Sequence, residues 1–127
     1  MDAIKTLGIW MDHSTADLID MDTENSSSSI TSKFTNNTKV EAMHKSENLM
    51  HNKEQQMQEA FYKKIADEIL KYDHVLLFGP TNAKAELHNY LNEDLHFKDK
   101  RIDIESTDKM LDHEKKAFVK RYFNMHA

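Results

Sequence analysis

The sequence predicts an α/β protein of three layers, in which helices cover both faces of a mixed five-stranded sheet. Residues 75–78 form a run without a polar side chain that ends at Gly79 and Pro80. This is typical of a parallel strand covered on both faces. Three short apolar or alternating segments precede this run, and alternating helical and strand patterns follow it. We therefore expect the element order β-β-β-α-β-α-β-α in a single domain, residues 1–127.

The five strands have distinct patterns. They are expected at residues 5–12, 16–20, 29–35, 74–78 and 101–105. In the first strand Leu7, Ile9 and Met11 share one face of the sheet. Trp10 lies on the opposite face, and Gly8 in the interior indicates close approach by another part of the chain. The second strand returns antiparallel, and the third strand has the alternation typical of a sheet edge.

Three helices are predicted from apolar positions spaced three or four residues apart. They are expected over residues 53–72, from Thr81 or Asn82 onward, and from a start between residues 107 and 112. Their inward positions are, in chain order, Met57, Phe61, Ile65 and Ile69; Ala83, Leu87, Tyr90 and Leu91; and Leu111, Phe118 and Tyr122. Residues 36–53 remain as a long, mildly basic connection, which we expect to be a mobile loop.

The order of the elements also predicts how they connect. A three-stranded meander followed by alternating helices and parallel strands is the order of the ribonuclease H-like fold. Right-handed crossovers place the first strand beside the fourth and give the sheet order 3-2-1-4-5. The carboxyl ends of these two parallel strands then bring Asp12, His13, Thr81 and Asn82 to one crevice, where ligands of such sheets gather.

Composition narrows the functional classes. The net charge of −5 argues against a protein that coats nucleic acid non-specifically, although it allows a local basic surface. The absence of cysteine and of a long apolar run favours a cytoplasmic protein without a membrane partner. With only two glycines the chain has no nucleotide-binding loop, and we expect no cofactor.

Three segments carry a family resemblance: residues 8–13 (Gly-Ile-Trp-Met-Asp-His), residues 76–87 and residues 121–123. The most specific is Gly-Pro-x-x-x-Lys-x-Glu-Leu at residues 79–87. The chain resembles the small bacterial translational machinery proteins, which are similar to the middle domain of archaeal and eukaryotic peptide-chain release factors and of Pelota. The resemblance implies a ribonuclease H-like fold and binding to the ribosome or to RNA.

The resemblance does not extend to the catalytic motif. In release factors the loop that precedes the first long helix carries Gly-Gly-Gln and enters the peptidyl-transferase centre. The matching residues 36–53 contain no glycine. The resemblance therefore implies association with translation without peptide release, and we expect no catalytic residue.

The candidate binding residues are Asp12, His13, Lys39, His44, Lys45, His51, Thr81, Asn82 and Lys84. Thr81 and Asn82 begin a helix, where an anion binds readily, but both residues also suit ordinary capping. Lys84, one turn inside, either faces the same site or is solvated. Asp12 stands where ribonuclease H-like nucleases hold metal, although a carboxylate accepting backbone bonds in a turn is the alternative. No metal site is expected.

Three functions remain open. The leading hypothesis is a non-catalytic protein that binds the ribosome or RNA. The first alternative is a metal-dependent nuclease or phosphotransfer enzyme, for which Asp12 is the only strong candidate. The second is an interaction module that forms a homodimer through the exposed edge of the third strand. Lys115, Lys116, Lys120 and Arg121 form either a basic patch or a complement to the carboxyl end of their helix.

Overall fold

The computed structural model describes residues 4–20, 27–32 and 47–125, without the side chains of residues 27 and 47–54. Its strands are β1 (Thr6–Met11), β2 (Thr15–Ile19), β3 (Ser27–Thr31), β4 (His74–Gly79) and β5 (Arg101–Ser106). Its helices are α2 (Glu47–Ile69), α3 (Ala83–Asn92), the 3₁₀ turn η1 (Leu95–Phe97) and α4 (Asp112–Met125). None of these described helices is both long and apolar enough to cross a membrane.

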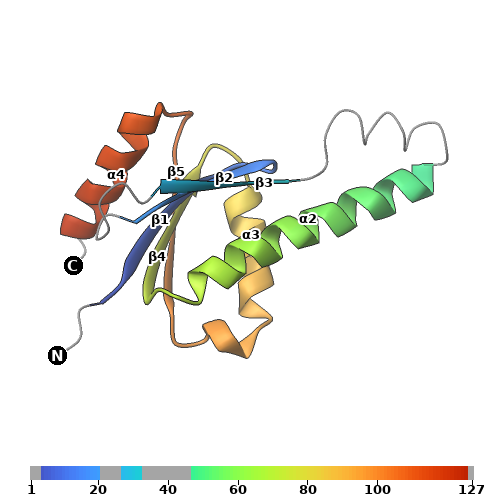
Figure 1. The fold of residues 1–127 in the computed structure, drawn as a ribbon, viewed down its shortest axis with the longest axis horizontal. Helices are drawn as coiled ribbons and strands as arrows, with labels where there is room; N and C mark the ends of the chain where they lie inside the picture. Colours follow the sequence, from blue (N-terminus) through green and yellow to red (C-terminus); the bar gives the residue numbers. More distant parts are fainter. Residues whose placement is uncertain (1–3, 21–26, 33–46, 126–127) are drawn as a thin grey trace.

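The five strands form one mixed sheet in the order β3-β2-β1-β4-β5 (Figure 1). β2 pairs antiparallel with both β1 and β3, whereas β4 pairs parallel with both β1 and β5. The register places Gly8 opposite Leu76 and Trp10 opposite Phe78. The predicted α/β class and strand order 3-2-1-4-5 are therefore confirmed.

Helices cover both faces of the sheet, as the apolar pattern of the strands predicts. Leu7, Ile9 and Met11 of β1 pack in one core with residues of α2 and α3. Trp10 faces the opposite side, where it joins the second core with Val119 of α4. β4 divides its side chains between the two cores in the same way and is buried along its whole length.

Helix α4 lies very close to β1 at Gly8. A Cβ atom at this position would lie 3.1 Å from Cβ of Val119 and 2.8 Å from its Cγ1, where ordinary contact begins at 3.4 Å. Both residues are buried. The close approach predicted at Gly8 is therefore confirmed, and its partner is Val119.

The first helix is longer than predicted. It begins at Glu47, six residues before the expected start at Lys53, because residues 47–53 contain strong helix formers and neither glycine nor proline. The prediction of an irregular connection is therefore wrong for residues 47–53. The remainder of that connection, residues 36–46, lies outside the described residues.

Two further differences concern the second half of the chain. Leu111, expected to face inward, is 64% exposed because it precedes the first residue of α4. Met110 packs in its place against the second core, which contains Trp10 and Val119. The turn η1 has no counterpart among the predicted elements, and Asp94 caps it by accepting a hydrogen bond from the backbone N–H of His96.

Candidate functional site

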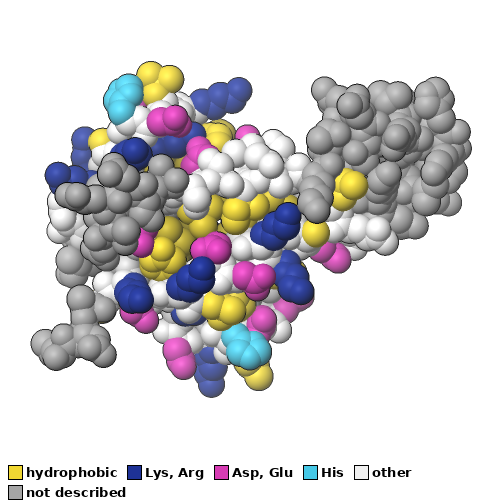
Figure 2. Space-filling view, viewed as in Figure 1, with side chains coloured by type: hydrophobic (Ala, Val, Ile, Leu, Met, Phe, Trp, Pro, Cys, Tyr) yellow, Lys and Arg dark blue, Asp and Glu magenta, His cyan; other side chains and the backbone are white. Residues whose placement is uncertain are grey.

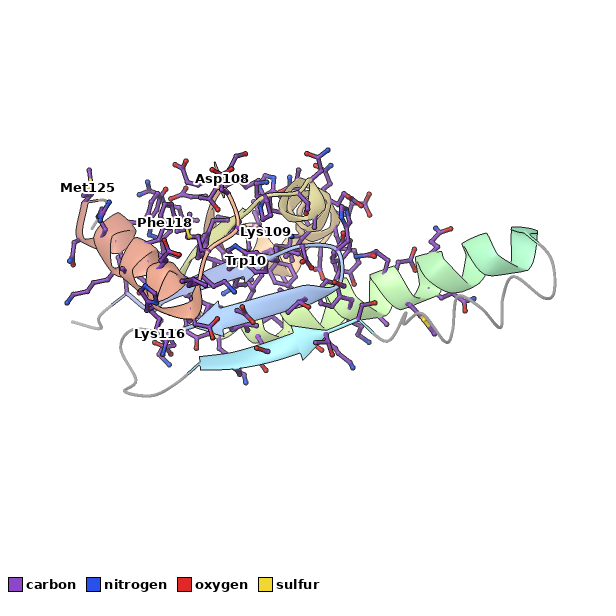
Figure 3. All side chains as sticks on the ribbon, turned by 90° about the horizontal axis from the view of Figure 1, so that it is seen from above. Trp10, Asp108, Lys109, Lys116, Phe118 and Met125 are labelled. Carbon is purple, nitrogen blue, oxygen red and sulfur yellow. The ribbon has the colours of Figure 1, made fainter. Side chains whose placement is uncertain are left out.

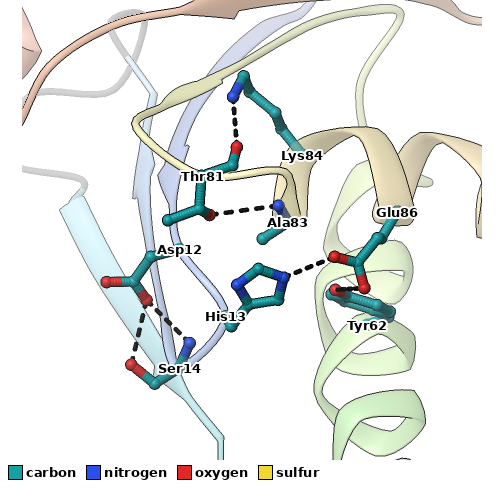
Figure 4. A network of polar contacts seen from close by, with 8 residues as sticks. All are labelled: Asp12, His13, Ser14, Tyr62, Thr81, Ala83, Lys84 and Glu86. Carbon is teal, nitrogen blue, oxygen red and sulfur yellow. Dashed lines mark hydrogen bonds and ion pairs between the residues drawn. The ribbon is translucent and has the colours of Figure 1, made fainter.

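The carboxyl ends of β1 and β4 meet at the crevice that the strand order predicts. Gly79 ends β4 with φ of +148°, a value that side chains rarely permit. A Cβ atom at Gly79 would collide with the carbonyl oxygen of Met11, the last residue of β1. Because the two backbones touch here, the residues that follow each strand lie on the same edge of the sheet (Figure 4).

Asp12 holds the turn between β1 and β2. Its Oδ1 accepts hydrogen bonds from the backbone N–H groups of Ser14 at 2.8 Å and Thr15 at 2.7 Å. The hydroxyl of Ser14 donates to the same oxygen at 3.1 Å. This geometry favours the interpretation of Asp12 as a turn carboxylate over its interpretation as a metal ligand.

His13 lies beside a carboxylate that the sequence-based site did not include. Its Nε2 is 2.5 Å from Oε2 of Glu86, and both side chains are 48% exposed. The hydroxyl of Tyr62 donates to the other oxygen of Glu86 at 3.4 Å. Burial, and secondarily the charge of Glu86, raise the pKa of Tyr62 to about 12, so its hydroxyl stays protonated at neutral pH. These three residues connect the β1–β2 turn, α3 and α2.

Thr81 and Lys84 at the start of α3 are engaged in local hydrogen bonds. Asn82 is the N-cap residue, but its side chain makes no capping bond. Oγ1 of Thr81 instead accepts a hydrogen bond from the backbone N–H of Ala83 at 3.2 Å. Lys84 is only 5% exposed, and its ammonium group donates to the carbonyl oxygen of Thr81. Lys84 is therefore neither solvated nor directed outward into the crevice.

The remaining candidates come from the connection between β3 and α2. Lys39, His44 and Lys45 lie outside the described residues, and the side chain of His51, which belongs to α2, lies outside them as well. The structure thus brings together Asp12, His13 and Thr81 from the predicted set, whereas the ammonium group of Lys84 turns back to the carbonyl of Thr81. Glu86 and Tyr62 were missed. Glu86 stands in the Gly-Pro-x-x-x-Lys-x-Glu-Leu motif, in the first turn of α3, and this position was the available signal.

The crevice supplies one histidine–carboxylate pair that could exchange a proton with a bound molecule. It does not align a nucleophile with that pair, since the hydroxyl of Ser14 donates to Asp12 and that of Thr81 accepts from the backbone. Within the described parts of the chain, no three or more His, Cys, Asp or Glu residues are grouped so as to hold a metal ion.

A second polar cluster lies at the opposite end of β4. His74 is buried, and its Nε2 lies 2.7 Å from Oδ2 of Asp103 on β5. The hydroxyl of Tyr122 on α4 donates to the same oxygen at 2.7 Å. Burial and the bond to Asp103 raise the pKa of Tyr122 to about 12. Partial burial alone would raise the pKa of Asp103, but the bonds from His74 and Tyr122 hold it below its ordinary value. This cluster fastens the end of α4 to the sheet.

Fold and site together define an α/β domain with a mixed sheet and a polar crevice at the carboxyl ends of its two central strands. In comparisons with known proteins, no family model matches this chain, and no curated protein matches it.

Proposed function

We propose that this is a non-catalytic, translation-associated protein of the cytoplasm that binds the ribosome or RNA. The observation that carries the proposal is the strand order 3-2-1-4-5, because the resemblance to the middle domain of release factors and Pelota implies a ribonuclease H-like sheet of this order. The ribosome is proposed as the partner because of this resemblance, which is carried by the segments 8–13, 76–87 and 121–123.

The connection between β3 and α2 is the region in which the proposal places contact with the ribosome. It runs from Ser32, beside the edge strand β3, to Glu47, the first residue of α2. The first turns of α2 extend beyond the sheet (Figure 1). Its predicted binding residues are Lys39, His44, Lys45 and His51. Lysine and protonated histidine bind phosphate oxygens, the commonest groups on the surface of RNA.

The non-catalytic part of the proposal has separate support. Residues 36–53 lack the glycines of the Gly-Gly-Gln motif. The alternative, a metal-dependent nuclease, requires several carboxylates around a metal pair, whereas the carboxylate of Asp12 is engaged by the β1–β2 turn. This use of Asp12 in the turn supports the proposal of binding over the nuclease alternative.

Self-association through β3 is compatible with the same proposal. β3 ends the sheet, so its outer backbone edge is where a second copy could add a strand. Light scattering over a range of protein concentrations tests this point: a mass that doubles with concentration supports a homodimer, and a constant monomer mass rejects it.

Sedimentation through a sucrose gradient tests the proposed function. At low salt the protein is expected to migrate with ribosomal subunits or ribosomes. Replacement of Lys39 and Lys45 by alanine should reduce the bound fraction, because fewer counterions are released on binding. Replacement of Lys63 and Lys64, two exposed lysines of α2, is the matched control and should leave the bound fraction unchanged. A wild-type protein that remains at the top of the gradient at low salt and also fails to bind RNA refutes the proposal.

A further inference from the structure

The outer face of α4 carries cations that form no ion pair with the carboxylates of the described residues. Lys116, Lys120 and Arg121 are exposed, and none of them forms an ion pair with another residue in the described part of the chain. No acidic residue occurs between Lys115 and Met125. Several Lys and Arg side chains are visible in Figure 2 over the region of the surface that α4 forms. Such a surface is unexpected in a chain with a net charge of −5.

The neighbouring Lys115 shows how this helix is oriented. Lys115 is buried, and its Nζ lies 2.5 Å from Oδ2 of Asp17 on β2 and 4.0 Å from the ring centre of Trp10. This cation is therefore neutralised inside the protein and fixes one side of α4 against the sheet. Figure 3 shows Phe118 and Lys116 on different sides of the helix. Because Val119 also contacts Gly8, the cationic side is held facing solvent.

The helix dipole does not explain the cations. Favourable interaction with the dipole is confined to the last turn of a helix, and the last turn of α4 contains no basic residue. Lys116 precedes the final residue of the helix, Met125, by nine positions. The acidic residues of α4, Asp112 and Glu114, are both in its first turn, where the dipole favours them. Beyond that first turn the exposed charge of the helix is positive only.

The spacing and chemistry of the cations fit a nucleic-acid backbone. Lys116 and Lys120 are four residues apart, so they lie on one side of the helix at about 6 Å from each other. Arg121 adds a planar guanidinium that can bind a phosphate with two parallel hydrogen bonds. The exposed neighbours on the same turns, Ala117 and Asn124, carry no ring on which a base could stack, and the ring of Phe123 packs edge-on against His74. Such a face contacts phosphates and does not read sequence.

We infer that the outer face of α4, through Lys116, Lys120 and Arg121, binds the phosphate backbone of RNA. This inference deepens the proposed function and rests on it. The inference places the RNA contact on α4, which lies on the face of the sheet opposite α2 and α3. The contact is electrostatic and does not depend on the RNA sequence.

Fluorescence anisotropy with labelled polyuridine measures the contact over a series of salt concentrations. The test protein is the full chain with Lys116, Lys120 and Arg121 all replaced by glutamine. The matched control replaces three other exposed lysines, Lys63, Lys64 and Lys98, and so changes the net charge equally. The test variant should lose affinity by roughly tenfold or more and lower the slope of log affinity against log salt by about 2, since each phosphate contact on a single strand contributes about 0.7. The control should change affinity less than about twofold.

Three outcomes would overturn the inference. The first is a test variant that binds polyuridine as well as wild type, and the second is an equal loss in test and control variants, which would reflect net charge alone. The third is polyglutamate binding that matches polyuridine binding and shows the same loss, which would indicate an acidic protein partner. Equal unfolding midpoints of the two variants in urea show that each is folded.

Ribosome sedimentation of the same proteins separates this inference from the proposed function. If the test variant and wild type sediment with ribosomes equally, the α4 contact is wrong and the proposed function stands. If wild type binds neither ribosomes nor polyuridine, the proposed function fails, and the α4 contact fails with it. If the test variant alone is lost from the ribosomal fractions, both are supported.

Discussion

Replacement of Gly8 by alanine is expected to lift α4 from the sheet. The added Cβ would collide with Cγ2 of Val119 and lie 2.8 Å from its Cγ1, so one group must retreat by more than 0.6 Å to reach the 3.4 Å at which ordinary contact begins. Neither group has free space, because Gly8 and Val119 are both buried. Overpacking of this kind costs about 1–3 kcal/mol. Loss of the conformational freedom of glycine in the unfolded chain offsets about 0.5–1 kcal/mol.

The net expectation is a loss of about 1 kcal/mol in the free energy of unfolding, measured by urea denaturation. A double-mutant cycle with Val119→Ala isolates the cause. Removing the two methyl groups of Val119 alone costs about 2 kcal/mol by lost burial and cavity formation. In the double variant the new methyl group at Gly8 occupies the space that Val119 vacates, so the total loss should stay below about 2 kcal/mol instead of reaching the additive value of about 3.

Two results would refute this reasoning. One is a loss below about 0.5 kcal/mol for Gly8→Ala, which is the range of ordinary surface changes. The other is simple additivity in the double variant, which would show that the alanine at Gly8 acts through the strand and not through Val119.

Further predictions concern three polar contacts. Asp12→Ala should cost about 1–2 kcal/mol of stability by urea denaturation, and Asp12→Asn, which retains the accepting oxygen, less than half of that. Tyr122→Phe should cost about 1 kcal/mol at neutral pH, because Asp103 loses a donor. In the wild-type protein stability falls between pH 10 and about 12, because the phenol of Tyr122 ionises from pH 10 in the unfolded state but only near pH 12 in the folded state. Tyr122→Phe removes this phenol and should therefore reduce the fall. The lowered pKa of Asp103 stabilises the folded state at pH values above 3.8, the ordinary pKa of an aspartate. This stabilisation is lost as the pH falls through the pKa of Asp103 in the folded state. Asp17→Asn should destabilise more than Lys115→Met, because it leaves a buried cation with only the exposed carboxylate of Asp112, 3.6 Å away, as its anion.

Each of these predictions has a contrary result. Equal losses for Asp12→Ala and Asp12→Asn would mean that the charge, and not the turn bonds, is important. An unchanged alkaline profile for Tyr122→Phe would contradict its raised pKa; some alkaline sensitivity should remain in this variant, because the pKa of Tyr62 is also raised to about 12. A smaller loss for Asp17→Asn than for Lys115→Met would mean that the ammonium group of Lys115 reaches water.

Most of the fold was predictable from the sequence because strand faces follow a period of two. The alternation of Leu7, Ile9 and Met11 with Trp10 assigns the two cores correctly. The start of α2 was not predictable in this way, because its first turns at residues 47–53 lack an apolar period and form on helix propensity. Leu111 was placed inward because the exact first residue of α4 decides which side chains belong to its inner face.

The candidate site was predictable in position but not in its bonds. Adjacent parallel strands place Asp12, His13 and Thr81 together by topology alone. The partner of His13 was not evident, because the contact with Glu86 depends on how far α3 is rotated about its axis. Lys84 was also difficult to assign, since a lysine in a first helical turn is usually solvated, and only its three-dimensional contact with the carbonyl of Thr81 shows it buried.

The most direct test of the central claim is the equilibrium affinity of immobilised protein for purified ribosomal subunits, measured as a function of salt. The account predicts binding at low salt whose log affinity falls linearly with log salt, as counterion release from RNA phosphates requires. The absence of binding at the lowest salt, or an affinity that salt does not alter, would contradict it.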